Sequence, residues 1–374
     1  MPENPLMNKT DYKRLGDYIR EVDSRNRDLT VTLSQGICNA KYFQNPKQIS
    51  DRPETHKIVR RGQFAYNRAT TRNGEKISIA LREGPDCTVS SAYQVFEIID
   101  EGKLLPQYLM MWFRRPEFDR LAIYHSHGSA HEFFGWEEMC DVRLPIPPLS
   151  RQREIVAEYE TLTRRIRLNE RLISTLESAA QTLYRRTFVD NIDPARLPPG
   201  WRTGTLSEIA ECFDYRRKPL AGYERENMKK LYPYYGAASL MDYVDDYLFD
   251  GCYILMGEDG TVMNEDKTPV VQYVRGKFWV NNHAHILKGK NGFDENLLYL
   301  VLRNSKIEDI ITGGVQAKIS QANMFSIPVL IPTEEELTVI ESRLSSLVGL
   351  SLTYMRENKT LTKIQNLLLA RIGE

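Results

Sequence analysis

The sequence lacks the features of secreted and membrane-spanning proteins. It has only five cysteines in 374 residues and no CxxC pair, which indicates reduced, structural thiols in a cytoplasmic protein. No run of about 18 apolar residues is present, so we expect no transmembrane helix and no membrane partner. The N-terminal segment has no basic stretch followed by an apolar one. The 50 basic and 50 acidic residues cancel, which argues against a generally basic nucleic-acid-binding surface but leaves room for a local basic groove.

The sequence also lacks the short motifs of common catalytic sites. It contains no G-x-x-x-x-G-K-[ST], no G-x-G-x-x-G after a strand and no amino-methyltransferase signature. Neither G-x-S-x-G nor H-E-x-x-H occurs. These short motifs therefore point to no catalytic or cofactor-binding site.

Two groups of residues leave a metal site open as an alternative. Histidines gather over residues 125–131 and again at His283 and His285, and residues two apart on a strand share a face. Glu258 and Asp259 follow a strand, as in half of a nuclease metal centre. Because neither group has further ligands at a familiar spacing, hydrogen bonding and turn formation are the favoured interpretations.

The chain contains an internal duplication. Ile146-Pro147 and Ile331-Pro332 close two proline-rich segments that lie 185 residues apart. Other short β patterns recur in the same order at offsets of 189 to 191 residues. They pair Leu15–Ile19 with Leu206–Ala210, Gly62–Tyr66 with Gly251–Leu255, and Val89–Phe96 with Val280–Leu287. Their shared order predicts two related halves.

A long helical pattern follows each proline-rich segment. Apolar residues recur every seven positions with charges between them and no proline, which is typical of a coiled coil. Each helix of about 40 residues would be about 60 Å long. The residues predicted to form the seam are Ile155, Leu162, Leu176, Leu183, Ile340, Leu347, Leu361 and Leu368.

Neither helix can bury its apolar stripe alone. An antiparallel pair within the chain is favoured over pairing between two chains, because one chain supplies two matched helices. Asn169 falls in the seam register, where an asparagine costs stability but can fix the alignment of the helices. The pattern predicts a first domain over 1–148, a central helix over 149–190, a second domain over 191–332 and a C-terminal helix over 333–374.

The two globular halves have the composition of mixed α/β (α+β) domains. In the second half we expect strands over 253–256, 270–274 and 278–280, with turns at 257–260 and 275–277, and a short helix over 294–304. A corresponding short helix is expected over 105–115 in the first half.

Polar turns in both halves favour nucleic-acid binding. Residues 66–73 in the first half and 215–218 and 313–318 in the second combine arginine, lysine, asparagine, threonine and tyrosine. Arginine can hydrogen-bond guanine or phosphate through two donors, and asparagine can do so with adenine. Each segment alone is typical of a solvated loop, so it is their recurrence that favours recognition.

Several segments carry a family resemblance. In the second half they are 233–237 (Pro-Tyr-Tyr-Gly-Ala), 243–260, 276–285 and 314–319, and in the first half residues 144–156 enter the central helix. In these segments and their order, nearly the whole chain resembles the specificity subunit of type I restriction–modification systems. The first half departs most from the pattern over 125–131.

The resemblance implies a fold and a function. It implies two pseudo-twofold-related target-recognition domains separated by two long antiparallel coiled-coil helices. Each domain would read one half of a bipartite, asymmetric DNA target, and the helices would set the gap and dock the methyltransferase subunits, of which we expect two. Those subunits would hold S-adenosylmethionine and methylate adenine, a separate restriction subunit would join them, and this chain would remain non-catalytic.

The resemblance and the polar turns together give the residues expected to face DNA. Lysine and arginine would mostly position phosphates, whereas asparagine, glutamate and tyrosine could read base edges. The candidates are Arg68, Thr70, Arg72, His127, Ser129, Arg217, Lys218, Tyr235, Glu258, Asn281, His283 and Lys318.

Two other functions stay open from the sequence. One is a coiled-coil scaffold with two protein- or sugar-binding heads and no DNA, which the zero net charge slightly favours. The other is a metal-dependent nuclease that uses Glu258 and Asp259. Cleavage by the isolated chain would favour the nuclease, and duplex binding that depends on a methyltransferase partner would favour the specificity subunit.

Overall fold

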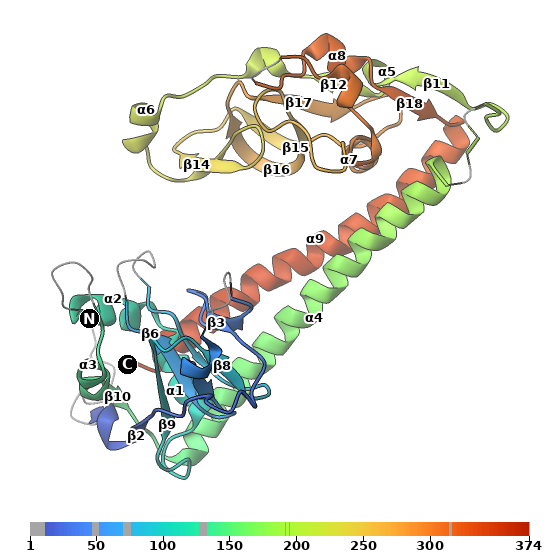
Figure 1. Cartoon of the computed structure of the whole chain (residues 1–374). Helices are drawn as coiled ribbons and strands as arrows, with labels where there is room; N and C mark the ends of the chain where they lie inside the picture. The colour runs from blue at the N-terminus through green and yellow to red at the C-terminus, as the bar shows by residue number, and fades with distance from the viewer. Residues whose placement is uncertain are drawn as a thin grey trace. The chain divides into compact units, whose positions relative to one another are not determined.

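The computed structural model describes residues 12–46, 52–69, 76–126, 133–190, 192–193, 195–313 and 316–373. The chain divides into two compact units, of which unit 1 comprises Met1–Asn169 and Glu357–Glu374, and unit 2 comprises Glu170–Arg356. Each unit contains one mixed α/β body and a part of both long helices (Figure 1). Four of the residues predicted to contact DNA, namely Thr70, Arg72, His127 and Ser129, lie outside the described residues.

Unit 1 is built on a four-stranded antiparallel sheet. Its strand order is β2 (Ile19–Val22), β9 (Tyr93–Ile98), β6 (Phe64–Asn67) and β7 (Ile79–Leu81). Three short strand pairs accompany it: β1 (Tyr12–Arg14) with β10 (Arg143–Pro145), β3 (Gly36–Ile37) with β4 (Phe43–Gln44), and β5 (Lys57–Val59) with β8 (Cys87–Val89). The helices of this body are α1 (Pro106–Phe113), α2 (Pro116–Tyr124) and α3 (Trp136–Asp141), and the 3-10 turns are η2 (Leu15–Asp17) and η3 (Pro53–Thr55).

The core of unit 1 follows from strand alternation. Phe64 and Tyr66 on β6 point to the side of the sheet that α1 covers, and Ala65 between them faces a second apolar cluster. Phe64 stacks on Phe96 of β9 with ring centroids 4.9 Å apart, and Phe113 of α1 meets both rings edge-on. This aromatic cluster fixes α1 on the sheet.

Unit 2 is built on a six-stranded sheet. Its order is β12 (Ala210–Cys212), β17 (Ala284–Gly289), β15 (Phe249–Gly257), β16 (Val271–Val280), β13 (Tyr232–Tyr235) and β14 (Leu240–Val244). All neighbours are antiparallel except β13 and β16, which are parallel. A separate pair joins β11 (Arg202–Thr205) to β18 (Pro328–Ile331). The remaining elements are α5 (Leu206–Ile209), η4 (Asp214–Arg216), α6 (Gly222–Glu226), α7 (Glu295–Asn304), η5 (Glu308–Ile310) and α8 (Gln321–Phe325).

The two units repeat one topology, which confirms the duplication inferred from the sequence. The order β2-β9-β6-β7 in unit 1 corresponds to β12-β17-β15-β16 in unit 2. The starts of β9 and β17 are 191 residues apart. The pair β1–β10 likewise corresponds to β11–β18, and α1 to α7. Unit 2 differs in that its hairpin β13–β14 joins the main sheet, whereas the pairs β3–β4 and β5–β8 of unit 1 form separate two-stranded sheets.

One expected turn in unit 2 is wrong. The sequence predicts that residues 275–277 separate two strands, but β16 runs without a break from Val271 to Val280. Gly276 has a φ of +90° and lies opposite Gly251, whose φ is +135°. Two glycines in register allow both strands to bend at the same point, because a side chain is rarely compatible with a positive φ.

The two long helices are α4 (Leu149–Phe188) and α9 (Glu334–Arg371), which lie side by side (Figure 1). In unit 1, Thr163 contacts Gln365 at 2.7 Å and Asn169 contacts Asn358 at 2.8 Å. As the residue number on α4 rises, the number of the contacting residue on α9 falls. The two helices are therefore antiparallel, as predicted.

The predicted seam residues lie along this helix pair. Ile340 is buried, and the other seven, Ile155, Leu162, Leu176, Leu183, Leu347, Leu361 and Leu368, are half-buried. On α4 the deepest apolar side chains, each with less than a tenth of its surface exposed, are Val156, Tyr159, Ala180, Tyr184 and Phe188. The buried stripe of α4 therefore lies beside the predicted seam positions rather than on them, because a two-helix pair leaves the edges of the stripe accessible to solvent.

Candidate nucleic-acid interface

Unit 2 brings four of the predicted residues together beside the ends of two neighbouring inner strands, where β15 ends and β17 begins. Arg217 follows η4, Glu258 comes directly after β15, His283 comes directly before β17, and Lys318 lies in the segment that leads to α8. Because β15 and β17 are antiparallel neighbours, the end of one strand meets the start of the other. Residues from four separate parts of the chain therefore share one small region, which we call the β15 edge.

Backbone hydrogen bonds hold the β15 edge together. The Glu258 amide donates to the His283 carbonyl at 2.9 Å, and the Glu258 carbonyl accepts from the Ile319 amide at 2.8 Å. Lys318 and Thr312 exchange two backbone hydrogen bonds of 2.8 Å. The segment around Lys318 is thereby fixed against the end of β15, since short ladders of this kind leave few backbone groups free to move.

The Glu258 carboxylate lies between two cations of different exposure. One of its oxygens accepts a hydrogen bond from Nη1 of Arg217, and the other lies 3.4 Å from Nζ of Lys318. The exposed fraction of the side chain is 14% for Glu258 and 16% for Arg217 but 54% for Lys318. Lys318 is therefore the group of this trio that is open to a ligand.

The Arg217 guanidinium is almost fully used within the protein. Besides Glu258, its Nη1 donates to the carbonyl of Ala284 at 3.0 Å, and its Nη2 lies 3.3 Å from Oδ2 of Asp214. Arginine offers five N–H donors in a fixed fork, so most of them are already directed to these acceptors. The predicted base or phosphate contact of Arg217 would need this network to open.

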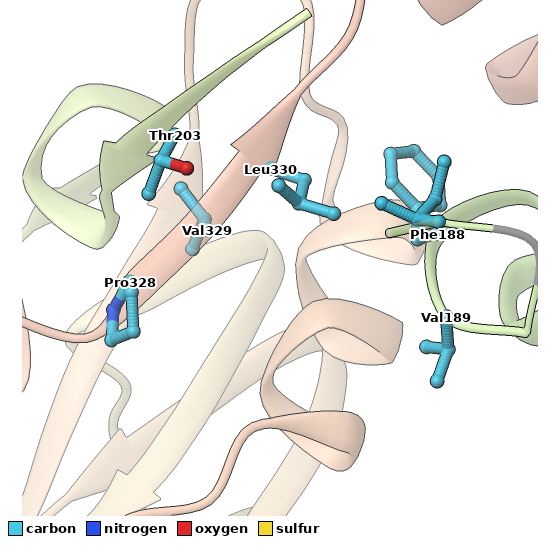
Figure 2. A pocket seen from close by; sticks show the side chains of 7 residues that line it. Phe188, Val189, Thr203, Pro328, Val329 and Leu330 are labelled. Carbon is cyan, nitrogen blue, oxygen red and sulfur yellow. The ribbon is translucent and has the colours of Figure 1, made fainter. Parts of the chain in front are cut away.

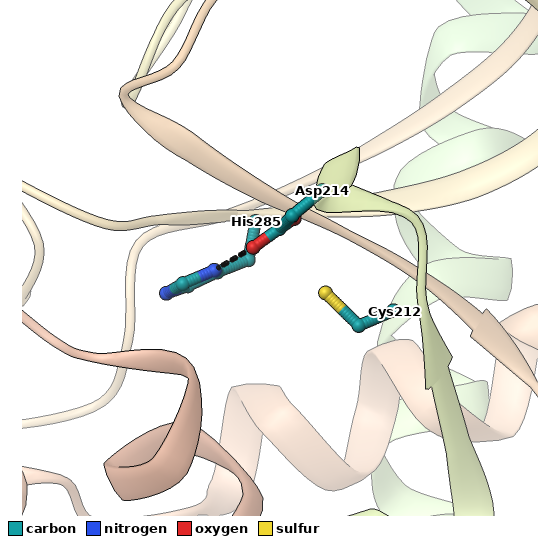
Figure 3. A group of neighbouring side chains, drawn as sticks. All are labelled: Cys212, Asp214 and His285. Atoms are coloured by element: carbon teal, nitrogen blue, oxygen red, sulfur yellow. Dashed lines mark hydrogen bonds and ion pairs between the residues drawn. The ribbon is translucent and has the colours of Figure 1, made fainter. Parts of the chain in front are cut away.

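Asp214, which lies against Arg217, pairs with the buried His285 (Figure 3). The His285 Nδ1 is 2.6 Å from Asp214 Oδ2, its Nε2 is 2.9 Å from the carbonyl oxygen of Ile319, and the side chain is 2% exposed. Burial alone would raise the pKa of Asp214, but the hydrogen bond and positive charge of His285 outweigh it and lower that pKa below its ordinary value.

Cys212 completes a group that could in principle hold a metal ion. The ligand atoms of Cys212, Asp214 and His285 lie within 4.8 Å of one another. The surrounding contacts do not favour a metal, because both nitrogens of His285 already face oxygen acceptors and the Arg217 cation lies against Asp214. Burial, and then the charge of Asp214, also raise the pKa of the Cys212 thiol to about 12, whereas a metal needs the thiolate. We interpret this group as an ion-pair network.

Asn281 and Tyr235 lie beside the β15 edge and are joined through the backbone. The Asn281 amide donates to the Tyr235 carbonyl at 3.0 Å. The Asn281 side chain is buried, with its Oδ1 accepting from the His283 amide at 2.9 Å and its Nδ2 donating to the Met241 sulfur at 3.4 Å. Asn281 thus shapes the turn before β17, which lowers its availability for a base edge.

Tyr235 and Lys218 occupy more open positions. Tyr235 is half-buried and meets the Phe278 ring edge-on at 5.9 Å, and burial raises the pKa of its hydroxyl. Lys218 is exposed, and its carbonyl accepts a hydrogen bond of 2.6 Å from the Trp279 indole. The backbone of Lys218 is therefore anchored while its ammonium group extends into solvent.

His283 is the other exposed group of the β15 edge. Its Nδ1 lies 2.6 Å from Oδ1 of Asp259, and its side chain is 47% exposed. His285, two residues on, is buried. The sequence could suggest that these two histidines act together, but their different surroundings assign His283 to the surface and His285 to the core.

In unit 1 the described part of the predicted interface is Arg68. Its side chain is exposed, and its carbonyl accepts from the Phe134 amide at 2.9 Å. A buried ion pair that the sequence did not reveal lies in the same unit, where Lys41 Nζ is 2.7 Å from Asp119 Oδ1. The same carboxylate oxygen accepts from the Ile77 amide at 3.2 Å, so Asp119 ties a hairpin, α2 and the approach to β7 together.

Unit 2 also has an apolar hollow of about 320 Å³ where α4 ends (Figure 2). Thr203 of β11 and residues 328–330 of β18 line one side, and Phe188 and Val189 line the other. The hollow is open to solvent and holds no charged side chain among its lining residues. It belongs to the joint between the helix and the β11–β18 pair rather than to the β15 edge.

The comparison with protein families decides what this body is. Residues 198–363, which include the whole β15 edge, match the family model described as type I restriction modification DNA specificity domain. Residues 198–363 are thus similar to that domain. The matched residues include the six-stranded sheet, the β15 edge and much of α9.

Two curated relatives from Haemophilus influenzae match parts of the chain. A putative type I restriction enzyme specificity subunit is 34% identical over 146 residues, which is 39% of this chain and 37% of that protein. The type I restriction enzyme HindI specificity subunit is 26% identical over 192 residues, which is 49% of this chain and 41% of that protein. The matches thus span about two fifths of the length of these relatives.

A solved structure shares the fold over the full chain. The S subunit of a type I restriction–modification system from M. genitalium covers 100% of this chain and 98% of its own, with a TM-score of 0.60 and 14% identity. At this identity the likeness shows the fold, namely two α/β bodies with long helices, and confirms the fold class predicted from the sequence. Among the described residues, no helix is long and apolar enough to cross a membrane.

Proposed function

We propose that the chain is the DNA-recognition subunit of a type I restriction–modification enzyme and that each unit reads one half of a bipartite target. The β15 edge is the main support, because it places the exposed Lys318 and His283 together on a DNA specificity domain. Protruding cations hold phosphates, and neighbouring polar groups can reach base edges. The repeated topology of unit 1 supports a second reading surface that includes Arg68.

The domain limits belong to this proposal. Residues 1–148 and 191–332 would be the two target-recognition domains, and residues 149–190 and 333–374 would be the helices that set the gap between half-sites. A rigid antiparallel pair suits this role, because its length does not depend on the sequence that the domains read.

The partners are proposed from the same family. Two methyltransferase subunits with bound S-adenosylmethionine would dock on the chain and methylate adenine, and restriction subunits would join the complex. The chain itself would be non-catalytic, would bind no cofactor and would act in the cytoplasm. We do not propose a nuclease, because Glu258 is bound by Arg217 and Lys318, and Asp259 by His283.

Selection from a random duplex library tests the proposal. The chain would be purified with its methyltransferase subunits, incubated with 40-base-pair random duplexes at about 0.15 M salt, and the bound duplexes sequenced. The proposal predicts enrichment of one split motif with a fixed gap. A well-formed complex that enriches no motif would contradict it and would favour a scaffold that does not read DNA.

A further inference from the structure

The acidic side chain at the centre of the β15 edge is unusual for a surface expected to meet a polyanion. Phosphates repel carboxylates, so an exposed glutamate there would weaken binding. Glu258 is instead 14% exposed and lies between the half-buried Arg217 and the exposed Lys318. Its two oxygens have separate partners, one for each cation.

The backbone of Glu258 adds to this arrangement. Its amide and its carbonyl bond two different segments, through His283 and Ile319. Lys318 has a long side chain with four rotatable bonds, and its head group would otherwise sample many positions over the sheet. The carboxylate at 3.4 Å restricts those positions. A restrained side chain loses less conformational entropy when it binds.

We infer that Glu258 is a positioning residue that holds the Lys318 ammonium group at a fixed place on the DNA-reading surface. In this arrangement Lys318 contacts DNA, and Glu258 acts through Lys318 without touching DNA. The inference rests on the proposed function and deepens it. It replaces the expectation from the sequence that Glu258 reads a base edge.

Positioning by Glu258 and the charge of Glu258 alone predict opposite effects of Glu258→Gln on affinity for the target. Glu258→Gln removes one negative charge beside a DNA-binding surface, and charge alone would strengthen binding to every duplex. Loss of positioning weakens binding to the target while binding to other duplexes stays the same or rises. The ratio of target to non-target affinity therefore falls, by about 10- to 100-fold if the loss equals that of one mismatched base pair.

The experiment compares four variants of the chain in complex with its methyltransferase subunits, namely Glu258→Gln, Glu265→Gln, Lys318→Ala and the double variant of Glu258→Gln with Lys318→Ala. Each is titrated on the duplex selected by the wild-type complex and on a scrambled duplex, at several salt concentrations. Glu258→Gln is the test. Glu265→Gln is the matched control, because Glu265 is exposed, lies in the same unit and loses the same charge. Glu258→Gln combined with Lys318→Ala shows whether the effect passes through Lys318.

The possible results distinguish failure of the positioning role of Glu258 from failure of the proposed function. The inference predicts a lower affinity ratio for Glu258→Gln, no change for Glu265→Gln, and no further loss when Glu258→Gln is added to Lys318→Ala. An additional loss in the double variant, or a target relaxed at one base position, would overturn it in favour of direct base contact. Tighter binding to both duplexes would also overturn it. If the wild-type complex does not discriminate at all, the proposed function fails.

Protein stability is checked in the same series. Arg217 keeps its bonds to Asp214 and the Ala284 carbonyl when Glu258 becomes glutamine, so the network around it stays largely paired. We expect the unfolding midpoint of Glu258→Gln to stay close to that of the wild type. Rescue of the affinity ratio by Glu258→Asp, which keeps the charge, would further support positioning, whereas equal losses in both variants would point to a general disturbance of the fold and contradict the inference.

Discussion

The Tyr12 hydroxyl donates a hydrogen bond of 2.8 Å to the carbonyl oxygen of Gly373, although 361 residues separate them. Tyr12 belongs to β1, and Gly373 follows the last turn of α9. The same tyrosine meets the Trp112 ring edge-on at 6.0 Å. The first and last described elements of the chain are thus joined inside unit 1, and α9 ends as part of that unit's core.

Replacing this tyrosine tests the joint. Tyr12→Phe removes the hydroxyl and leaves the Gly373 carbonyl without that donor, so we expect unit 1 to lose about 1 kcal/mol of stability. Urea unfolding, followed by tryptophan fluorescence, measures the change. Tyr124→Phe is the control, because that side chain is 81% exposed and its loss of a hydroxyl has little effect. Equal midpoints for Tyr12→Phe and wild type would contradict the predicted contribution.

The buried Asn169 is expected to lower the stability of the α4–α9 helix pair. Its Nδ2 donates to Asn358 Oδ1 at 2.8 Å, but its own Oδ1 has no hydrogen-bond partner despite being buried. A polar pair of this kind costs stability and fixes alignment. We expect the double variant Asn169→Leu, Asn358→Leu to unfold at higher urea, by about 1–2 kcal/mol in the free energy of unfolding.

The single variant Asn169→Leu is the informative comparison. It leaves the Asn358 amide without its partner, so we expect it to be less stable than the double variant. If the double variant unfolds at lower urea than wild type, the asparagine pair is a stabilising contact and its interpretation as an alignment device is wrong.

Lys318 gives a prediction about salt. If its ammonium holds a phosphate, Lys318→Ala lowers the slope of log affinity against log salt by about one. Lys267→Ala is the control, because Lys267 is not one of the residues of the β15 edge and its ammonium lies 2.9 Å from the Glu308 carboxylate. An unchanged slope for Lys318→Ala would remove Lys318 from the contact surface.

The Asp214–His285 pair predicts a dependence on pH. The pKa of Asp214 is lowered below its ordinary value of 3.8, so its ionised form stabilises the folded state above that value, and this contribution is lost as the pH falls through the folded pKa. Asp214→Asn should therefore be less stable than wild type at pH 7, by about 2 kcal/mol, the scale of a hydrogen bond to a charged group.

The difference between the two proteins should shrink as the pH falls below about 4, because the unfolded wild-type chain then binds a proton at Asp214 that the folded protein takes up only at lower pH. Urea unfolding of both proteins at pH 7 and pH 3 gives the comparison. A difference that stays constant across this range would show that the charge of Asp214 does not contribute.

Periodicity and order explain how much of the fold the sequence predicts. The heptads locate both long helices because every seventh residue must meet the partner helix. The shared offsets reveal the duplication, because both halves build the same sheet. The continuous strand β16 was missed at Gly276, since a glycine next to charged residues is typical of a turn and only the opposing Gly251 shows that the strand continues.

The candidate site was predicted less completely. Polar turn segments in the sequence predict Arg217, Glu258 and Lys318 as candidates. The ion pairs between these side chains depend on the order of the strands, which no local sequence pattern gives. The burial of His285 beside Asp214 could not be inferred for the same reason, because the two are 71 residues apart. This pairing changes the role expected of Glu258, from contact with a base to positioning of Lys318.

The central claim, that this chain selects the DNA that its partners methylate, is tested most directly by mapping methylated adenines. The chain and its methyltransferase subunit would be co-expressed in a host without other adenine methylation, and the host DNA sequenced with single-molecule detection. The account predicts methylation at one split motif with a fixed gap, and Lys318→Ala should reduce the fraction of its sites that are methylated. Methylation that is absent or lacks a common motif, in cells where the complex is formed, would contradict it.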